Sequence, residues 1–188
     1  MRANNRVGFT LVEIMVAIAV IALMATIISP MLRVRRPGQE RKEFVGTLNA
    51  LMRLASQQAT VSRKIHRVLF SLKDNKMVKV TVQIKGEGND SKGDPIFATI
   101  KAPYLSSSIK WPSNLLVKQF FIEGIDEKAR EGRVSTEFWF FIMPEGLAQD
   151  VIINAVDMHD GPRNKPQQVG LVLNPFSVQF KMYDSFQK

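Results

Sequence analysis

A glutamate inside a long apolar stretch is the feature that most constrains this chain. Residues Phe9–Leu32 have the sequence FTLVEIMVAIAVIALMATIISPML, in which Glu13 is the sole charged side chain. A helix of this length crosses a hydrocarbon core of about 30 Å. A carboxylate inside such a core costs about 3 kcal/mol on insertion scales, so Glu13 needs a partner or a functional reason.

The segment before this stretch is short and polar. Met1–Gly8 carries two arginines as its charges. A cleaved secretory signal would have a shorter apolar region followed by a small-x-small cleavage site, whereas here basic residues follow Leu32. An uncleaved signal anchor is the stronger alternative. Glu13 near the start of the span argues against it, unless that carboxylate lies near the lipid headgroups.

Cleavage after Gly8 would create a partner for Glu13. The new α-amino group of Phe9 would be a cation at the apolar end of the helix. Along a straight helix four residues rise about 6 Å, so the amine does not easily reach Glu13 of its own chain. An axially displaced copy could bring its amine to this carboxylate, and pairing in a low dielectric offsets the cost of both charges.

The order Gly8-Phe9-Thr10-Leu11-Val12-Glu13 before an apolar helix resembles the class III signal of type IV pilins and type II secretion pseudopilins. In that family a prepilin peptidase cuts after the glycine and methylates the new N-terminal phenylalanine. The resemblance implies cleavage between Gly8 and Phe9, N-methylation of Phe9, and an assembly role for Glu13. Pro30 matches a proline that is common in the same helix.

Two interpretations of Pro30 stay open. It removes a helical hydrogen bond and would kink the rod, which would let a subunit extend within a filament. Alternatively it marks the helix end at the membrane surface, helped by Pro37-Gly38.

The flanking charges do not decide the membrane orientation, because basic residues lie on both sides of the stretch. The resemblance implies a single-pass protein of the inner membrane, with a cytoplasmic N-terminus and a periplasmic C-terminal domain. It implies as partners other pilin or pseudopilin subunits, the prepilin peptidase, an inner-membrane assembly platform and the lipid bilayer. Secreted cargo is a further candidate partner.

Composition limits the remaining chemistry. The chain has 188 residues, a formal net charge of +9 and no cysteine, which excludes disulfides and thiolate metal sites. The positive charge favours anionic surfaces. Basic residues cluster directly after the apolar stretch, at Arg33, Arg35, Arg36, Arg41 and Lys42.

The pattern after Gly38 predicts an amphipathic helix. Phe44, Leu48, Leu51, Ala55 and Ala59 recur at helical spacing, with polar residues such as Arg41, Glu43 and Asn49 between them. We expect one helix over Gln39–Ser62, continuing the membrane helix after a kink. The expected organisation is a leader at 1–8, an assembly helix at 9–32, its amphipathic continuation at 33–65 and a β-rich domain at 66–188.

The remainder predicts antiparallel strands. Met77–Lys85 alternates, with Val78, Val80, Val82 and Ile84 expected to face inward, and Lys73-Asp74-Asn75 predicts a hairpin turn after Val68–Leu72. Further candidates are Ile96–Ala102, Leu115–Glu123, Thr136–Met143, Val151–Val156, Val169–Leu173 and Ser177–Met182. The predicted fold class is α+β, a long N-terminal helix packed on antiparallel sheets, and pilin-like.

The downstream order also resembles GspH-like minor pseudopilins and FimT-like minor pilins. The shared features are the long helix, the early hairpin Val68–Ile84, and a late strand before a Pro-x-Gly turn such as Pro144-Glu145-Gly146.

No catalytic motif, cofactor fingerprint or metal site is predicted. The two histidines, His66 and His159, lie far apart in sequence, and the carboxylates have no acid–base spacing. Gly86–Asp94 contains oxygen ligands that Ca²⁺ accepts, but it fits no EF-hand and is expected to be a solvated loop, as is Met158–Asn164.

Nucleic acid is an alternative partner. Arg53, Arg63, Lys64, His66 and Arg67 bracket the end of the predicted helix, and phosphate contact would require several of them on one exposed face. A solvated basic face is the simpler interpretation.

The leading hypothesis is a minor pseudopilin of a type II secretion system, a structural subunit and not an enzyme. One alternative is a FimT-like minor pilin of a type IV pilus that binds DNA. An alternative of another class is a signal-anchored periplasmic enzyme or binding protein whose N-terminus matches by chance.

Overall fold

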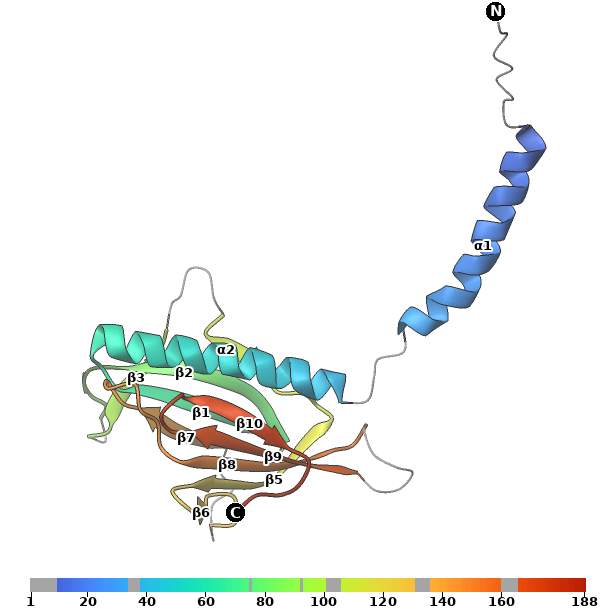
Figure 1. The fold of residues 1–188 in the computed structure, drawn as a ribbon. Coiled ribbons are helices and arrows are strands. Elements are labelled where there is room, and N and C mark those ends of the chain that lie inside the picture. Colours follow the sequence, from blue (N-terminus) through green and yellow to red (C-terminus); the bar gives the residue numbers. More distant parts are fainter. Residues whose placement is uncertain are drawn as a thin grey trace, which may run out of the picture. The chain divides into compact units, whose positions relative to one another are not determined.

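The structure is a computed structural model that describes residues 10–33, 38–74, 76–91, 93–100, 106–130, 136–159 and 166–188. The chain divides into two compact units, Met1–Gln39 and Glu40–Lys188. The first unit contains α1, Leu11–Arg33. The second contains α2, Gln39–Ser62, apart from its first residue, together with the strands (Figure 1).

The helix α2 forms where the sequence predicts it. Gly38, the residue before it, has a φ of 76°, which a right-handed helix does not contain, so α2 starts at Gln39. The predicted apolar stripe is buried, and two further apolar residues join it. The buried apolar residues of α2 are Phe44, Leu48, Leu51, Met52, Leu54, Ala55 and Ala59.

Within the described residues, ten strands form two antiparallel sheets. The first sheet has the order β3-β2-β1-β7, with β4 also paired to β2, and the second has the order β10-β9-β8-β5-β6. The first sheet comprises β1 (His66–Lys73), β2 (Lys76–Asn89), β3 (Pro95–Thr99), β4 (Ser108–Lys110) and β7 (Glu137–Ile142). The second comprises β5 (Leu115–Ile122), β6 (Ile125–Asp126), β8 (Val151–Asp157), β9 (Gln167–Asn174) and β10 (Gln179–Tyr183).

The predicted β1–β2 hairpin is confirmed, with one error in its register. Lys73 pairs with Lys76 across the turn, and Asp74 adopts a φ of 51° there. Val78 was expected to face inward, and this is wrong, because it is 40% exposed. A bulge opposite Ser71/Leu72 makes Met77 the inward residue and leaves Val78 outside the pairing.

The strand predictions differ from the structure mainly at the short elements. β3 ends at Thr99, whereas the expected strand ran to Ala102, part of which lies outside the described residues. β4 and β6 were not predicted, since three and two residues are too few to show an alternating pattern. The other expected strands match within a few residues.

Aromatic side chains join the two sheets and α2 in one core. The ring of Phe70 on β1 lies 5.1 Å from that of Phe120 on β5, which connects the sheets. The ring of Phe44 on α2 packs edge-on against Trp111 at 4.8 Å. This arrangement confirms the predicted α+β class, with a helix packed on antiparallel sheets.

Two polar residues of α2 stabilise the fold through contacts with the second sheet. The sequence had predicted both on the polar side of the helix. Arg41 is 8% exposed, and its Nε lies 3.4 Å from an oxygen of the buried Asp157 on β8. The amide of Asn49 donates to the carbonyl of Phe180 and accepts from the Phe180 N–H, at 2.9 and 2.7 Å. Both contacts hold α2 against the second sheet.

The C-terminal tail crosses the second sheet. The buried amide of Asn154 accepts from the N–H of Gln187 and donates to its carbonyl, at 2.9 and 2.8 Å. Gly170 makes room for this crossing, because a Cβ there would lie 2.5 Å from the carbonyl oxygen of Ser185. The tail is therefore an integral part of the second unit.

Candidate assembly site

Thr10 and Glu13 cap the N-terminus of α1 reciprocally. The backbone N–H of Glu13 donates to the Thr10 hydroxyl at 3.3 Å, and the backbone N–H of Thr10 donates to Oε2 of Glu13 at 3.3 Å. The Thr10 carbonyl accepts the first helical hydrogen bond, from Ile14, at 3.2 Å. This is a capping box, which satisfies two backbone donors that the helix itself leaves without acceptors.

Thr10 is a site residue that the sequence analysis missed. The pattern Thr-x-x-Glu before an apolar run is the usual sign of a capping box and was readable from the sequence. It also gives Glu13 a role within its own chain. The carboxylate at the first turn complements the positive end of the helix dipole.

The capping box uses one oxygen of Glu13. Oε2 accepts from Thr10, whereas Oε1 has no hydrogen-bond partner among the described residues. The Glu13 side chain is exposed in the isolated chain. The carboxylate therefore has one free oxygen, Oε1, which can accept a hydrogen bond from another molecule.

The apolar surface of α1 is exposed wherever its side chains are described. Each side chain from Leu11 to Thr26 is exposed. Among the large apolar side chains of this segment, the most exposed are Leu11 (75%), Val12 (68%), Ile21 (66%) and Leu23 (66%). An exposed apolar surface of this extent is typical of sites that bind lipid or protein.

Three predicted site features are described in part or not at all. Gly8 and Phe9 lie outside the described residues. The backbone of α1 is helical through Pro30 to Arg33, but the Pro30 side chain is not among those described. In the part of the chain that the structure describes, no helix reaches the combined length and hydropathy of a membrane span.

The basic cluster at the end of α2 does not form one exposed face. His66 is fully buried, and its Nδ1 donates to the carbonyl of Lys64 at 2.9 Å. Burial lowers the pKa of His66, while the Lys64 carbonyl opposes that shift. The guanidinium of Arg67 lies 4.1 Å from the centre of the Phe97 ring and bonds Gln83. Neither residue is available to a phosphate as the nucleic-acid hypothesis required.

The segment considered for Ca²⁺ was expected to be a loop throughout, and this is wrong for Gly86–Asn89, which belongs to β2. The turn that follows is closed by its own hydrogen bonds. The Asp90 N–H donates to the carbonyl of Asp94, and an Asp90 carboxylate oxygen accepts from the Asp94 N–H at 3.0 Å. Among the described residues, no group of three or more potential metal ligands occurs. Residues 160–165 of the second candidate loop lie outside the description.

The family comparison bears directly on the N-terminal segment. The model of the prokaryotic N-terminal methylation motif matches residues 4–29. The N-terminal segment thus has the pattern of a prokaryotic methylation motif. The match includes Gly8, Phe9 and Glu13, the residues on which the predicted resemblance rests. No curated protein matches the sequence.

The fold comparison finds solved structures with a partly similar fold. Two of these are structures of the minor pseudopilin EpsH from the type II secretion system of Vibrio cholerae. The first has a TM-score of 0.48 and 12% identity, and the match covers 76% of this chain and 95% of that chain. The second has the same TM-score and identity, and covers 78% and 95%.

Proposed function

We propose that this chain is a membrane-anchored, pilin-like subunit of a filament, cleaved between Gly8 and Phe9 and methylated on Phe9. The observation that carries the proposal is the methylation motif at residues 4–29, which overlaps α1, a helix whose side chains are exposed from Leu11 to Thr26. Lipid covers that surface before assembly, and the helices of other subunits cover it within the filament.

Glu13 sets the axial register of neighbouring subunits. Its Oε1 accepts a hydrogen bond from the α-amino group of Phe9 in an adjacent copy. Its Oε2 keeps the hydrogen bond from the backbone N–H of Thr10 in its own chain. The two charges attract strongly in an apolar surrounding, and bringing them together removes the penalty of leaving either one unpaired. A subunit that is misplaced along the axis loses this pairing, so correct placement is favoured.

At a finer level, we propose a minor pseudopilin of a type II secretion system that acts mechanically and has no enzymatic activity. The inner membrane holds the Phe9–Leu32 helix, and the β-rich domain lies in the periplasm, where it contacts other subunits or secreted cargo. The domain supports this role through a rigid core in which α2, both sheets and the C-terminal tail are joined.

A substitution at Glu13 tests the assembly mechanism. Glu13→Val should insert into membranes as well as the parent or better, because it removes a charge from the apolar segment. Its incorporation into filaments should fall at least about tenfold, since the lost pairing is a charge-assisted contact. Membrane fractionation measures insertion, and crosslinking to neighbouring subunits in sheared filaments measures incorporation.

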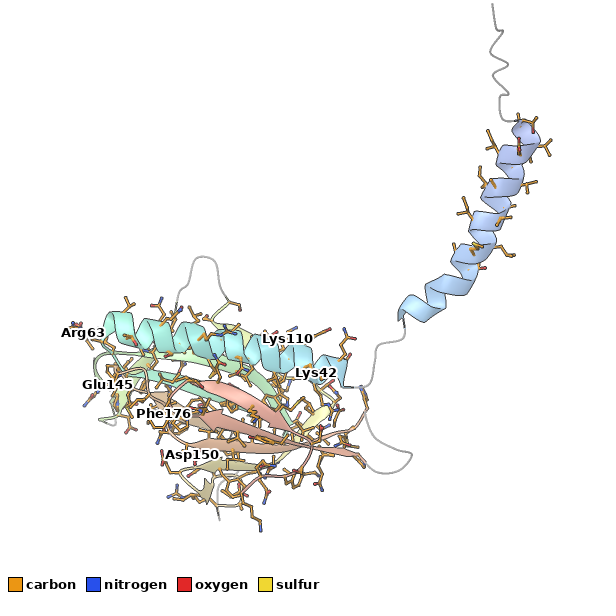
Figure 2. The ribbon with its side chains drawn as sticks, in the orientation of Figure 1. Lys42, Arg63, Lys110, Glu145, Asp150 and Phe176 are labelled. Atoms are coloured by element: carbon orange, nitrogen blue, oxygen red, sulfur yellow. The ribbon has the colours of Figure 1, made fainter. Side chains whose placement is uncertain are left out.

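Glu145→Val is the matched control, because Glu145 is an exposed carboxylate on the turn after β7 (Figure 2). It should leave both insertion and incorporation unchanged. If Glu13→Val assembles as well as the parent, the pairing mechanism is wrong.

Deletion of the gene for this chain in its native host distinguishes a role in protein secretion from a role in pilus assembly. Loss of protein export with intact surface pili supports the pseudopilin assignment. Loss of pili or of DNA uptake with normal export would instead support the pilus alternative.

A further inference from the structure

Five exposed lysines gather at the end of the second unit where α2 begins. They are Lys42 on α2, Lys73 and Lys76 beside the β1–β2 turn, Lys79 on β2 and Lys110 on β4. Figure 2 shows Lys42 and Lys110 at this end, with Arg63, Glu145 and Phe176 at the opposite end. The contact between Phe44 and Trp111 fixes the start of α2 beside the end of β4. We refer to these five residues as the lysine end.

Strand pairing places four of these lysines on one face. Val80 and Ile109 pair with each other and pack against the core, so Lys79 and Lys110, one position further along each strand, project to the outer face. Leu72 and Met77 face the core in the same way. Lys73 and Lys76 therefore project outward as well.

The same pairing brings like charges directly opposite each other. Lys73 pairs with Lys76, and Lys79 pairs with Lys110. Like charges directly opposite in a sheet destabilise it. Within the described residues none of the five lysines has an ion-pair partner. Folding therefore does not explain this arrangement, whereas an anionic partner would relieve the repulsion.

The carboxylates near the lysine end are too few to neutralise it. Asp74 lies in the turn between Lys73 and Lys76, and Glu137 on β7 pairs with Ser71. On α2, Glu40 and Glu43 flank Lys42, and both make interactions of their own. Asp157 is buried and engaged with Arg41. The outer face keeps an excess of positive charge.

The covalent chain limits how far the lysine end can lie from a membrane that holds α1. Residues 34–38 connect Arg33 to Gln39, and six Cα–Cα steps reach at most about 22 Å. Arg35 and Arg36 lie in this connection. We propose that the lysine end binds the anionic headgroups of phospholipids at the membrane surface. The inference rests on the proposed membrane anchoring and adds the lipid class that the domain recognises.

Binding of the second unit to vesicles tests the proposal without the anchor. A fragment of residues 38–188 retains every member of the hydrophobic core, which begins at Phe44, so it contains what it needs to fold. It should cosediment with vesicles that contain phosphatidylglycerol, and not with vesicles of phosphatidylcholine alone. Binding should weaken as salt rises, because exposed charges are screened.

A matched pair of variants localises the binding. Substitution of Lys73, Lys76, Lys79 and Lys110 by Gln should reduce binding to phosphatidylglycerol vesicles by about tenfold or more. Substitution of four exposed cations elsewhere, Arg53, Arg63, Lys64 and Lys118, by Gln removes the same charge and should leave binding within about twofold. Circular dichroism checks that each variant folds, and K73Q/K76Q replaces the fourfold variant if that one does not.

Equal losses in both variants would overturn the proposal, because net charge alone would then explain the binding. Absence of binding to phosphatidylglycerol vesicles would overturn it too. Neither result affects the proposed filament function, which depends on Glu13 and the processed N-terminus.

Discussion

The described helices α1 and α2 are nearly equal in length, with 23 and 24 residues. Their apolar side chains differ in exposure to solvent. Side chains of α2 such as Leu48 and Ala55 are completely buried. Those of α1 from Leu11 to Thr26 are all exposed. The second unit thus provides a core for α2, whereas the described side chains of α1 keep their apolar surface exposed.

The polar contacts of the two helices differ in the same way. α2 is held by long-range contacts, such as those of Asn49 with Phe180. The described polar contacts of α1 are local, those of Thr10 with Glu13 and of Thr26 with Leu23. Substitutions in α2 should therefore change the stability of the domain, and substitutions in α1 should not.

The largest effect is expected from truncating the buried face of α2. Leu48→Ala should lower the free energy of unfolding of the domain by about 2–5 kcal/mol, through lost burial and the cavity it leaves. Ile18→Ala in α1 should leave that free energy unchanged, because Ile18 is 61% exposed. Urea unfolding in detergent, followed by the fluorescence of the buried Trp111, measures both. An equal effect of the two substitutions would break the comparison.

The next effect concerns the tail that closes the second unit. Gly170→Ala places a Cβ against the Ser185 carbonyl and should cost about 1–3 kcal/mol, because backbone must move. Gly46→Ala on the exposed side of α2 meets nothing within 4 Å and should instead stabilise by about 0.5–1 kcal/mol. The same unfolding measurement applies. A neutral Gly170→Ala would mean that the tail is dispensable.

A smaller and strictly local effect is expected at the capping box. Thr10→Ala should destabilise the first turn of α1 by about 1 kcal/mol and leave the unfolding of the domain unchanged. Amide hydrogen exchange in detergent should become faster at Glu13 and Ile14. Thr47→Ala, which removes a hydroxyl from mid-helix in α2, is the control and should leave exchange in α1 unaltered. Unchanged protection in the Thr10 variant would show that the cap does not hold this turn.

The smallest effect on the stability of the domain is expected at His66. This effect develops only as the pH falls below neutral. Burial lowers its pKa in the folded state, so between the folded and the ordinary pKa the unfolded chain binds more protons. The stability of the domain should therefore fall as pH decreases from about 6.5, with the loss complete below the folded pKa. His66→Gln should flatten this dependence between pH 7.5 and 5, whereas His159→Gln at an exposed position should retain it. Identical slopes would show that His66 does not contribute.

Local patterns predicted much of the fold. The stripe of α2 and the β1–β2 hairpin were visible because helical and alternating periods extend over enough residues. The bulge that exposes Val78 was not, since it depends on how β2 aligns with β1. The buried pair of Arg41 and Asp157 joins distant parts of the sequence, and neither residue has a local pattern that indicates burial.

At the candidate site, too, the sequence predicted local features and not those that depend on strand pairing. Glu13 was identified from its charge within an apolar stretch, and Thr10 was missed although its spacing to Glu13 was visible. The lysine end could not be predicted, because Lys79 and Lys110 become neighbours through strand pairing alone.

Mass spectrometry of the N-terminus of the native protein, extracted from membranes, tests the central claim most directly. We expect a chain that starts at Phe9 and carries one additional methyl group on its amine. A chain with Met1–Gly8 intact would contradict it, because Glu13 would then lack the amine that its placement in an apolar helix requires.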